Sequence, residues 1–501
     1  MTDHTMHILK TRAIGIDTYH ENIIYMREDC HICRSEGFRA LTRVVVNYNG
    51  VSIIATLNVV SSGWLRHNEA GLSKKAMQLL NVKEGDEISV HHLGSIESLS
   101  KVRSKIYGNE LDEESWKEIV TDIVAGKYSN VELSAFVTAC ANNNLSQNEI
   151  ISLTKAMVNT GQQLNWENTI VLDKHCAGGL PGNRTTPIVI SIVAAAGLTI
   201  PKTSSKAITS PSGTANTMET ITRVDLSIEE IKKVVKQEGA CLVWGGAVQL
   251  SPADDILISI EKALDIDSEG QMVASVLSKK MAAGATHVLI DIPVGETAKV
   301  RSNSEALLLK NYFMETGSAI GLEVKVIITD GSQPVGKGIG PALEAMGVLS
   351  VLRNEHDCPQ DLKNRSLQLA EELIAMSGKF PKGEEKQIAL TLLETGKALE
   401  KFISICKAQG GFTEPTPGPF RYDYLSVKSG TVKKIDNRKL ARVAKLAGAP
   451  KSSGAGVMFY APLGKKIKEN DVLFSIYADA SGELEYAKQY LEKITGLITI
   501  E

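Results

Sequence analysis

One stretch of the sequence decides the fold, Asp173-Lys-His-Cys-Ala-Gly-Gly-Leu-Pro-Gly-Asn-Arg-Thr-Thr186. It follows an apolar run at residues 169–173 and leads into a second apolar run, so we expect a strand, a glycine-rich turn and a helix. Glycines let backbone N–H groups approach an anion, and the helix dipole favours negative charge at its start. Lys174 adds a positive charge, and Thr185 and Thr186 add hydroxyl groups near the first helical turn. The stretch predicts an anion site, although the glycines alone fit a tight strand-to-helix connection equally well.

A second loop of similar chemistry follows, Thr203-Ser-Ser-Lys-Ala-Ile-Thr-Ser-Pro-Ser-Gly-Thr-Ala-Asn216, with seven hydroxyl side chains and one lysine in fourteen residues. It also lies between an apolar run, residues 198–201, and an expected helix. Open α/β sheets bind their ligands at the carboxyl ends of their strands. Two such loops on adjacent strands favour phosphate over a metal ion or an apolar ligand.

The surrounding sequence predicts a mostly parallel sheet covered by helices. Short, largely apolar runs at residues 169–173, 287–291 and 324–330 suit strands that are buried on both faces. Residues 362–376 and 385–406 have helical patterns and would supply the cover. We read Gly336-Lys-Gly-Ile-Gly340 as structural, because a proline stands where a dinucleotide fingerprint needs its third glycine.

Other segments predict further domains, so that the whole is a multidomain α/β and α+β protein. An Asn-Gly turn at residues 49–50 joins two apolar strands in a β-rich N-terminal region. Trp116 begins an amphipathic helical stripe, Ser146 begins a capping box, and residues 410–419 form a linker rich in proline and glycine. The predicted domains are a β-rich one at 1–95, a small helical one at 98–165 joined by about 256–284, a large phosphate-binding α/β one at 166–255 and 285–415, and a small α+β one at 424–497.

The composition excludes several classes of partner. Lys and Arg number 55 against 58 Asp and Glu, giving a net charge of −3, which offers no reason to expect nucleic acid or an anionic membrane surface. No apolar run approaches the ~20 residues of a membrane span, and the first residues do not resemble a signal peptide, so we expect a cytoplasmic protein. Seven scattered cysteines agree with a reducing compartment. Cys30 and Cys33 form a Cys-x-x-Cys motif, which fits reduced thiols near a turn, a redox pair or part of a metal site.

Four blocks of the sequence, in order, resemble those of the thymidine/pyrimidine-nucleoside phosphorylase family. They are the Asp173-Lys-His-Cys-Ala-Gly-Gly block, the loop at 204–214, Ala274-Ser-Val-Leu-Ser-Lys-Lys280 and Ile328-Thr-Asp-Gly-Ser-Gln-Pro-Val-Gly336. The C-terminal region is similar to the family's C-terminal domain. The additional N-terminal region is like that of the subgroup containing AMP phosphorylases. The resemblance spans most of residues 98–497.

The resemblance implies a pentosyltransferase that splits a nucleoside with inorganic phosphate as co-substrate, and with no metal or organic cofactor. The expected reaction is thymidine plus phosphate giving thymine and 2-deoxy-α-D-ribose 1-phosphate. The expected partners are a small-molecule nucleoside or nucleotide and phosphate, and the expected assembly is a homodimer or a larger homo-oligomer. By resemblance, Lys174, Gly179, Thr186, Ser204 and Thr214 would bind phosphate, His175, Asp267 and Lys279 would be catalytic, and Ser205, Lys206, Ala207, Ile208, Thr209, Ser210, Ser275 and Lys299 would bind the nucleoside or nucleotide.

Three departures from the family pattern leave the nucleoside open. Cys176 replaces a phosphate-contacting serine, and a thiol is a weaker donor than a hydroxyl. The thymine-contacting Tyr-x-x-Arg has no counterpart, because residues 257–260 read Leu-Ile-Ser-Ile. Position 206 is lysine where AMP-acting relatives have arginine, which removes a planar fork for phosphate. The alternatives are an AMP-type nucleoside 5′-monophosphate phosphorylase, a phosphoribosyltransferase and a non-catalytic nucleotide-binding sensor.

The proton for the departing base has three candidate sources. These are a protonated His175, Asp267 and the ammonium of Lys279. Each has a plainer reading as well: His175 fits a buried structural histidine, and Asp267 fits a solvated carboxylate at a helix end.

Overall fold

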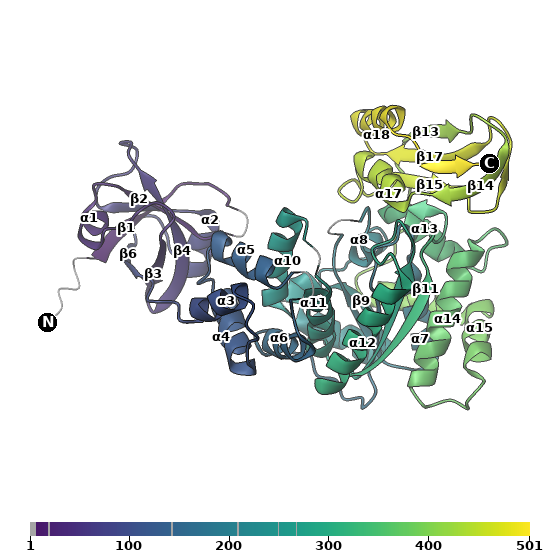
Figure 1. Ribbon diagram of the computed structural model, residues 1–501, viewed down its shortest axis with the longest axis horizontal. Helices are drawn as coiled ribbons and strands as arrows, with labels where there is room; N and C mark the ends of the chain where they lie inside the picture. Colours follow the sequence, from purple (N-terminus) through teal and green to yellow (C-terminus); the bar gives the residue numbers. More distant parts are fainter. Residues whose placement is uncertain (1–6, 19–20, 142–143, 208–209, 249, 267) are drawn as a thin grey trace. The chain divides into compact units, whose positions relative to one another are not determined.

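The computed structural model describes residues 7–18, 21–141, 144–207, 210–248, 250–266 and 268–501. The chain forms two compact units (Figure 1). The first comprises Met1–Asn144 with Ile256–Ile266, and the second comprises Leu145–Asp255 with Asp267–Glu501. No helix in the described part of the chain is both long and apolar enough to cross a membrane.

A closed barrel of six strands forms the start of the first unit. Asn49 and Gly50, with φ of 46° and 83°, make the predicted hairpin turn between residues 43–48 and 51–60. Alternate side chains of the strands point inward, and this buries Val44, Val46 and Ala55 completely. The strands are β1 (Ile8–Ala13), β2 (Ile23–Arg27), β3 (Arg43–Tyr48), β4 (Val51–Val60), β5 (Glu69–Leu72) and β6 (Glu87–His92), in the order β1-β5-β2-β4-β3-β6, and the barrel carries the helices α1 (His31–Glu36) and α2 (Lys74–Leu80).

Helices follow the barrel. The predicted stripe is confirmed within residues 113–124, where Trp116 is fully buried and lies edge-on to Phe136 with ring centroids 5.9 Å apart. The capping box predicted at Ser146 is also confirmed, since its side chain and that of Glu149 bond each other's backbone N–H groups. The predicted domain limits stay predictions. The helices are α3 (Ser98–Ile106), α4 (Glu113–Val124), α5 (Asn130–Ala139), α6 (Gln147–Asn159), α10 (Pro252–Leu264) and α11 (Glu269–Ala282), of which α6 packs on α11 in the second unit.

A parallel sheet forms the centre of the second unit. Its strands are β7 (Leu172–Cys176), β8 (Ile200–Ser204), β9 (Ala240–Trp244), β10 (His287–Val294) and β11 (Glu323–Asp330). They pair in parallel in the orders β11-β10-β7 and β8-β9, and a parallel bridge between Val171 and Thr199 joins the two sets. The carboxyl ends of all five strands therefore lie along one edge.

The first strand of this sheet is placed differently from the expectation. The sequence predicts a strand over residues 169–173 with Lys174 and His175 in the following loop, whereas β7 runs from Leu172 through Cys176. The reason is pairing: residues 172–176 match residues 287–291 of β10 one to one. The polar residues at the start of the glycine-rich stretch are thus held by sheet hydrogen bonds.

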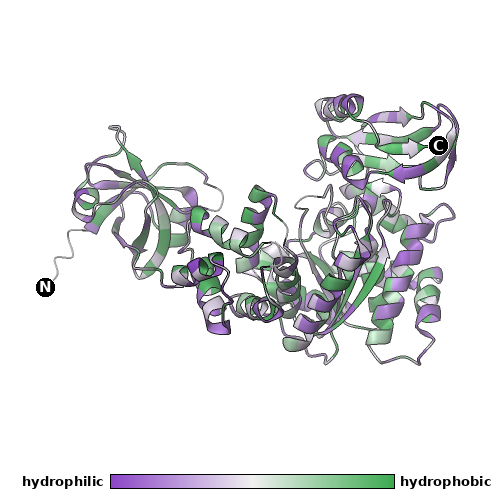
Figure 2. Ribbon diagram, in the orientation of Figure 1, coloured by the Kyte–Doolittle hydropathy of each residue, from purple (hydrophilic) through white to green (hydrophobic). Residues whose placement is uncertain are grey.

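Helices cover both sides of the sheet, and Figure 1 shows α12 (Asn303–Ala319) on one side of β11 and α14 (Gln360–Met376) on the other. In Figure 2 the visible strands of the sheet are mainly hydrophobic, whereas α14 carries hydrophilic residues on its outside. The single helix expected over residues 385–406 is two helices, because Gly396 adopts a φ of 78°. The remaining elements are α7 (Thr185–Ala195), α8 (Thr214–Glu219), α9 (Ile228–Glu238), η2 (Gly245–Val248), α13 (Pro341–Leu352), α15 (Glu385–Glu394) and α16 (Lys397–Ala408).

The C-terminal region forms two small antiparallel sheets with two helices, and one of its strands comes from outside it. Gly338–Ile339, which we read as structural, forms β12 and pairs with residues 457–458. The sheets have the orders β12-β15-β17-β13 and β16-β14-β18. The elements are β13 (Phe420–Leu425), β14 (Gly430–Ile435), β15 (Gly456–Phe459), β16 (Lys466–Ile467), β17 (Val472–Ala478), β18 (Ile498–Ile500), α17 (Asn437–Leu446) and α18 (Ser481–Lys493).

Candidate active site

Both loops singled out from the sequence lie at the carboxyl ends of neighbouring strands. The first runs from the end of β7 at Cys176 to the start of α7 at Thr185. The second runs from the end of β8 at Ser204 to the start of α8 at Thr214. Each loop therefore turns its chain toward a helix start, where backbone N–H groups are free to bind an anion.

Lys174 connects the two ends of the first loop. It is completely buried, and its Nζ donates to Oγ1 of Thr185, also completely buried, at 2.9 Å. Thr186, which the sequence analysis chose, is 6% exposed in the next position of α7. Gly179 has a φ of 57°, and a Cβ there would meet nothing within 4 Å, so the backbone at this position borders open space.

A buried ion cluster lies directly beside Lys174, and sequence reasoning did not find it. Asp173 Oδ1 is 3.2 Å from Nζ of Lys202, and Asp173 Oδ2 is 2.8 Å from Nζ of Lys280. Burial alone would raise the pKa of Asp173, but the two ammonium groups lower it overall. Burial lowers the pKa of Lys280 to about 7, with Lys202 adding to the shift and Asp173 opposing it. Two buried lysines thus share one buried aspartate, and a third buried lysine, Lys174, lies next to it in sequence, which favours the arrival of an anion.

His175 follows Lys174 on β7 and is half-buried. Burial lowers its pKa well below the ordinary value, and repulsion from Lys280, Lys202, Lys279 and Lys174 lowers it further. The imidazole is therefore neutral at neutral pH. This argues against the protonated His175 that the sequence analysis allowed as a proton donor.

Cys176 ends β7 and is a neutral thiol. Its Sγ accepts a hydrogen bond from Nδ2 of Asn183 at 3.2 Å. Burial raises the pKa of Cys176 to about 12, and the buried carboxylate of Asp291 contributes to that shift. A thiol in this state can take part in the site only as a weak hydrogen-bonding group.

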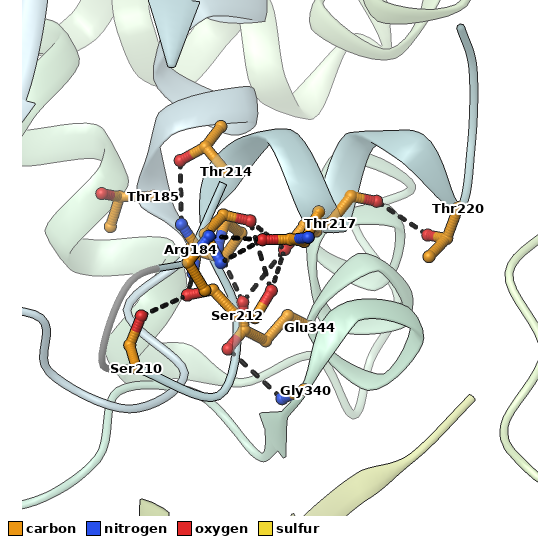
Figure 3. A network of polar contacts seen from close by, with 12 residues as sticks. Arg184, Thr185, Ser210, Ser212, Thr214, Thr217, Thr220, Gly340 and Glu344 are labelled. Carbon is orange, nitrogen blue, oxygen red and sulfur yellow. Dashed lines mark hydrogen bonds and ion pairs between the residues drawn. The ribbon is translucent and has the colours of Figure 1, made fainter. Parts of the chain in front are cut away.

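Arg184 connects the first loop to the second (Figure 3). Its Nη1 donates to Oγ1 of Thr214 at 2.8 Å, its Nη2 donates to the backbone oxygen of Ser212 at 3.0 Å, and its Nε donates to Oε2 of Glu344 at 2.7 Å. The planar guanidinium directs three donors from three different nitrogens, and the single nitrogen of a lysine cannot reproduce that fork. Arg184 therefore fixes the hydroxyl of Thr214, a predicted phosphate ligand, relative to the start of α7.

Glu344 on α13 is the acceptor that completes this network. It is 2% exposed, and Oε2 also accepts from Oγ1 of Thr217 at 3.1 Å, while Oε1 accepts from the backbone N–H of Gly340 at 3.3 Å. Figure 3 shows the carboxylate between the starts of α8 and α13. Sequence reasoning missed both Arg184 and Glu344. The position of Arg184 at the end of the glycine-rich turn could have indicated its role. Nothing in the sequence indicated that Arg184 pairs with Glu344, which lies 160 residues away.

The second loop is folded tightly against α8. Oδ1 of Asn216 accepts from the backbone N–H groups of Ala207, at 2.6 Å, and Gly213, at 3.2 Å. The Oγ of Ser204 is buried and has no hydrogen-bond partner among the described residues. An unpartnered hydroxyl costs free energy unless a ligand or water bonds it. Ser205 is exposed and Ser210 donates to the backbone oxygen of Ser212, whereas Ile208 and Thr209 lie outside the described residues.

The ammonium group of Lys206, a predicted nucleotide ligand, contacts two other side chains. Its Nζ is 2.9 Å from Oε1 of Glu219 and lies 5.0 Å from the ring centroid of Trp244. The charge of Lys206 is therefore already paired with a carboxylate and an aromatic face.

The other predicted nucleoside ligands lie on α11 and in the loop after β10. Ser275 and Lys279 are one helical turn apart on α11, as expected, and both are half-buried. Nζ of Lys279 donates to Oδ2 of Asp254 at 2.7 Å. Lys299 is exposed in the loop after β10, and Asp267 lies outside the described residues. In the described part of the chain, no three His, Cys, Asp or Glu residues are grouped to hold a metal ion.

Three segments of the chain match models of known domain families. Residues 99–161 match the helical bundle domain of the glycosyl transferase family, and residues 168–399 match the a/b domain of that family. Residues 431–498 match the pyrimidine nucleoside phosphorylase C-terminal domain.

Curated relatives match along the whole chain. A protein of Legionella pneumophila (strain Corby) is 55% identical over 500 residues, covering 100% of this chain and 97% of the relative. A protein of Hahella chejuensis (strain KCTC 2396) is 53% identical over 501 residues, covering 100% of this chain and 99% of the relative. Both carry the name “Putative thymidine phosphorylase”.

Among solved structures, anthranilate phosphoribosyltransferase (TrpD) from Thermus thermophilus has a similar fold. It is 18% identical with a TM-score of 0.52, and the match covers 62% of this chain and 98% of that one. At this identity the likeness concerns the fold.

Proposed function

This chain belongs to the thymidine/pyrimidine-nucleoside phosphorylase family and is therefore a pentosyltransferase, and we propose that it converts thymidine and phosphate to thymine and 2-deoxy-α-D-ribose 1-phosphate. The single observation that carries the proposal is the series of contacts Lys174–Thr185, Arg184–Thr214 and Arg184–Glu344. Lys174 holds the start of α7 at the end of the first loop, and Arg184 joins that point to Thr214 at the end of the second loop. Both loops end at helix starts, and this combination suits a phosphate dianion.

The buried charges around β7 support phosphate as the co-substrate. Lys174, Lys202 and Lys280 are each at most 4% exposed, and Asp173 is the carboxylate that faces two of them. Buried charges without compensation are costly, so a bound dianion would lower the free energy of the site. In the proposed mechanism a phosphate oxygen attacks C1′ while the bond from C1′ to the base breaks. The anion beside the sugar stabilises the positive charge that develops on the ring.

The electron pair of the broken bond leaves with the base, and Lys279 is the group that we propose to stabilise the resulting negative charge. Its ammonium is held by Asp254, and it shares a helix face with Ser275. A neutral His175 would act as a hydrogen-bonding group and not as the acid, since its pKa is depressed. Asp267 stays a proposed donor by resemblance. One displacement inverts C1′ and gives the α-sugar 1-phosphate.

The contacts of Lys206 favour a nucleoside over a nucleoside 5′-monophosphate as the substrate. A 5′-phosphate would need free cations in the second loop, and Lys206 is already engaged by Glu219 and Trp244. Recruiting it would break an ion pair. We further propose that the reaction needs no metal or organic cofactor, and that the enzyme works in the cytoplasm as a homodimer or a larger homo-oligomer.

A base-release assay tests the proposal. The full-length protein is incubated with thymidine, uridine, cytidine, AMP, CMP and UMP, each with and without phosphate, and free base and sugar phosphate are separated by chromatography. We expect phosphate-dependent release of thymine with stoichiometric sugar 1-phosphate, and loss of activity in Lys174→Met. Turnover of the 5′-monophosphates alone would assign the chain to AMP-type phosphorylases. No turnover of any of the six would overturn the proposal.

A further inference from the structure

Asp173 is a buried carboxylate on β7 that contacts two lysines from two different elements. Its Oδ1 lies 3.2 Å from Nζ of Lys202 on β8, and its Oδ2 lies 2.8 Å from Nζ of Lys280 on α11. Asp173, Lys202 and Lys280 are 0%, 4% and 3% exposed, so water and salt screen these contacts little. Each oxygen of the carboxylate therefore holds a different part of the structure.

The face of β7 that carries Asp173 is the one that faces the nucleoside in the proposed reaction. Successive side chains of a strand point to opposite faces, so Asp173 shares a face with His175 and not with Lys174. Lys174 accordingly contacts Thr185 at the start of α7. The two lysines that meet Asp173 thus lie on the side of β7 where His175 lies, apart from the contacts of the first loop.

Lys202 extends the contact from Asp173 to the start of the second loop. Its Nζ donates to the backbone oxygen of Thr203 at 2.8 Å. The next residue, Ser204, ends β8 and is a proposed phosphate ligand, and its buried hydroxyl has no hydrogen-bond partner among the described residues. Asp173 and Lys202 together therefore fix the backbone from which the second loop leaves the sheet.

Lys280 attaches α11 to the same carboxylate. The preceding residue, Lys279, contacts Asp254 instead, with Nζ 2.7 Å from Oδ2, and shares a helix face with Ser275. Consecutive side chains of a helix differ in direction by about 100°, so one lysine can anchor the helix while its neighbour points elsewhere. The contact of Lys280 therefore sets where the helix face of Ser275 and Lys279 lies relative to β7.

We propose that Lys280 and Lys202 are positioning residues with separate tasks: through Asp173, Lys280 fixes the nucleoside-binding face of α11, and Lys202 fixes the phosphate-binding second loop. The assignment rests on the proposed phosphorolysis. Removing either ammonium group leaves the other paired with Asp173, so the buried carboxylate keeps one counter-charge in each variant. The nucleoside half and the phosphate half of the site can thus be disturbed one at a time.

Steady-state kinetics of Lys280→Met and Lys202→Met, with each substrate varied at saturation of the other, test the proposal. The full-length protein is assayed with the nucleoside that the wild-type enzyme turns over best. The assay is run at about pH 6.5, because burial lowers the pKa of Lys280 to about 7 and its ammonium must be charged. Each variant is the matched control of the other, since both remove one buried ammonium from the same carboxylate.

The two variants should differ in which substrate they affect. Both lose a positive charge near the phosphate, so we expect a common rise in the KM for phosphate. Beyond this, Lys280→Met should raise the KM for the nucleoside about 10-fold, as the loss of one charge-assisted hydrogen bond would cause. Lys202→Met should leave the KM for the nucleoside at the wild-type value and raise the KM for phosphate more than Lys280→Met does.

A general loss of structure would affect both substrates alike. An equal rise of the nucleoside KM in the two variants, or an unchanged nucleoside KM in Lys280→Met, would overturn the proposal. So would a phosphate KM that is no higher in Lys202→Met than in Lys280→Met. Far-UV circular dichroism checks folding, and glutamine, which still donates one neutral hydrogen bond to Asp173, replaces methionine in a variant that does not fold. Inactivity of the wild-type enzyme toward every nucleoside and nucleotide would refute the proposed function, on which the assignment rests.

Discussion

Lys279 on α11 and Asp254 on α10 form an ion pair with Nζ 2.7 Å from Oδ2. The side chain of Asp254 is 2% exposed and that of Lys279 is 26% exposed. The carboxylate of Asp254 is thus fixed in the interior. It holds the partly exposed ammonium of Lys279 in one position on the helix face that also carries Ser275. Lys279 is consequently presented as an oriented charge, which suits stabilisation of an anion that forms only during a reaction.

Asp254→Asn should reduce catalysis more than binding of phosphate. The amide keeps the size of the side chain but removes the charge that orients Lys279, so we expect kcat/KM for the nucleoside to fall by about 10- to 100-fold. Steady-state kinetics with each substrate varied in turn should show little change in the KM for phosphate. The control is Asp225→Asn, since the side chain of Asp225 is 68% exposed and pairs with Arg223 at the surface. An equal loss in both variants would contradict the positioning role.

Arg184→Lys should weaken phosphate binding. Lysine cannot reproduce the three contacts to Thr214, Ser212 and Glu344, so the second loop loses its attachment to the first. We expect the KM for phosphate to rise about 10-fold, as the loss of one charge-assisted hydrogen bond would cause. Phosphate saturation curves at fixed nucleoside measure this. Arg353→Lys is the matched control, because Arg353 pairs with Glu414 at the surface. An unchanged KM for phosphate in Arg184→Lys would show that the network does not support the phosphate site.

His175 should resist protonation across the neutral range. Its folded-state pKa is depressed, mainly by burial and then by the four nearby lysines, so it stays neutral as the pH falls through the ordinary histidine value. The unfolded chain takes up that proton near pH 6.5, and the contribution of His175 to stability is therefore lost as the pH falls below this value. NMR titration of the imidazole resonances, with His175→Gln for assignment, should show no titration of His175 between pH 6 and 8. A titration midpoint of His175 between pH 6 and 8 would refute the prediction.

Gly213→Ala should displace the second loop. A Cβ at this position would lie 2.7 Å from the backbone oxygen of Ser205 and 2.8 Å from the backbone nitrogen of Ala207. Because both are backbone atoms, the loop must move, and overpacking of this kind costs about 1–3 kcal/mol. We expect a lower melting temperature and a higher KM for phosphate. Gly482→Ala, where a Cβ would meet nothing within 4 Å in helix α18, should leave the KM for phosphate unchanged and should not lower the melting temperature. Wild-type behaviour of Gly213→Ala would contradict the close packing of this loop.

Local features of the fold could be predicted because their signals are contained in a few neighbouring residues. The Asn49-Gly50 hairpin, the capping box at Ser146 and the stripe that begins at Trp116 each follow from short-range rules of geometry. The two loops were found for the same reason, as hydroxyl- and glycine-rich segments after apolar runs. Where the expectation failed, at the start of β7 and at Gly396, strand pairing and one residue of positive φ decided the outcome.

The partners within the candidate site could not be predicted, since they are distant in sequence. Arg184 and Glu344 are separated by 160 positions, and Asp173 meets lysines that come from β8 and α11. No periodicity relates such residues, because their contact depends on how the sheet and helices pack. The depressed pKa of His175 has the same origin, as four lysines from three elements surround it. The sequence could therefore propose ligands, but not the charge state of the site.

The strand β12 has a consequence for how this protein can be divided. Its two residues, Gly338 and Ile339, complete the C-terminal sheet by pairing with β15, and the next residue, Gly340, donates to Glu344 in the candidate site. Cutting the chain in the proline-rich segment before Phe420 would leave this strand without its partner and loosen the turn that precedes Glu344. The residues after that segment thus stabilise the anion-binding loops through β12 and Glu344. A protein that lacks these residues should be less active even though every proposed ligand remains.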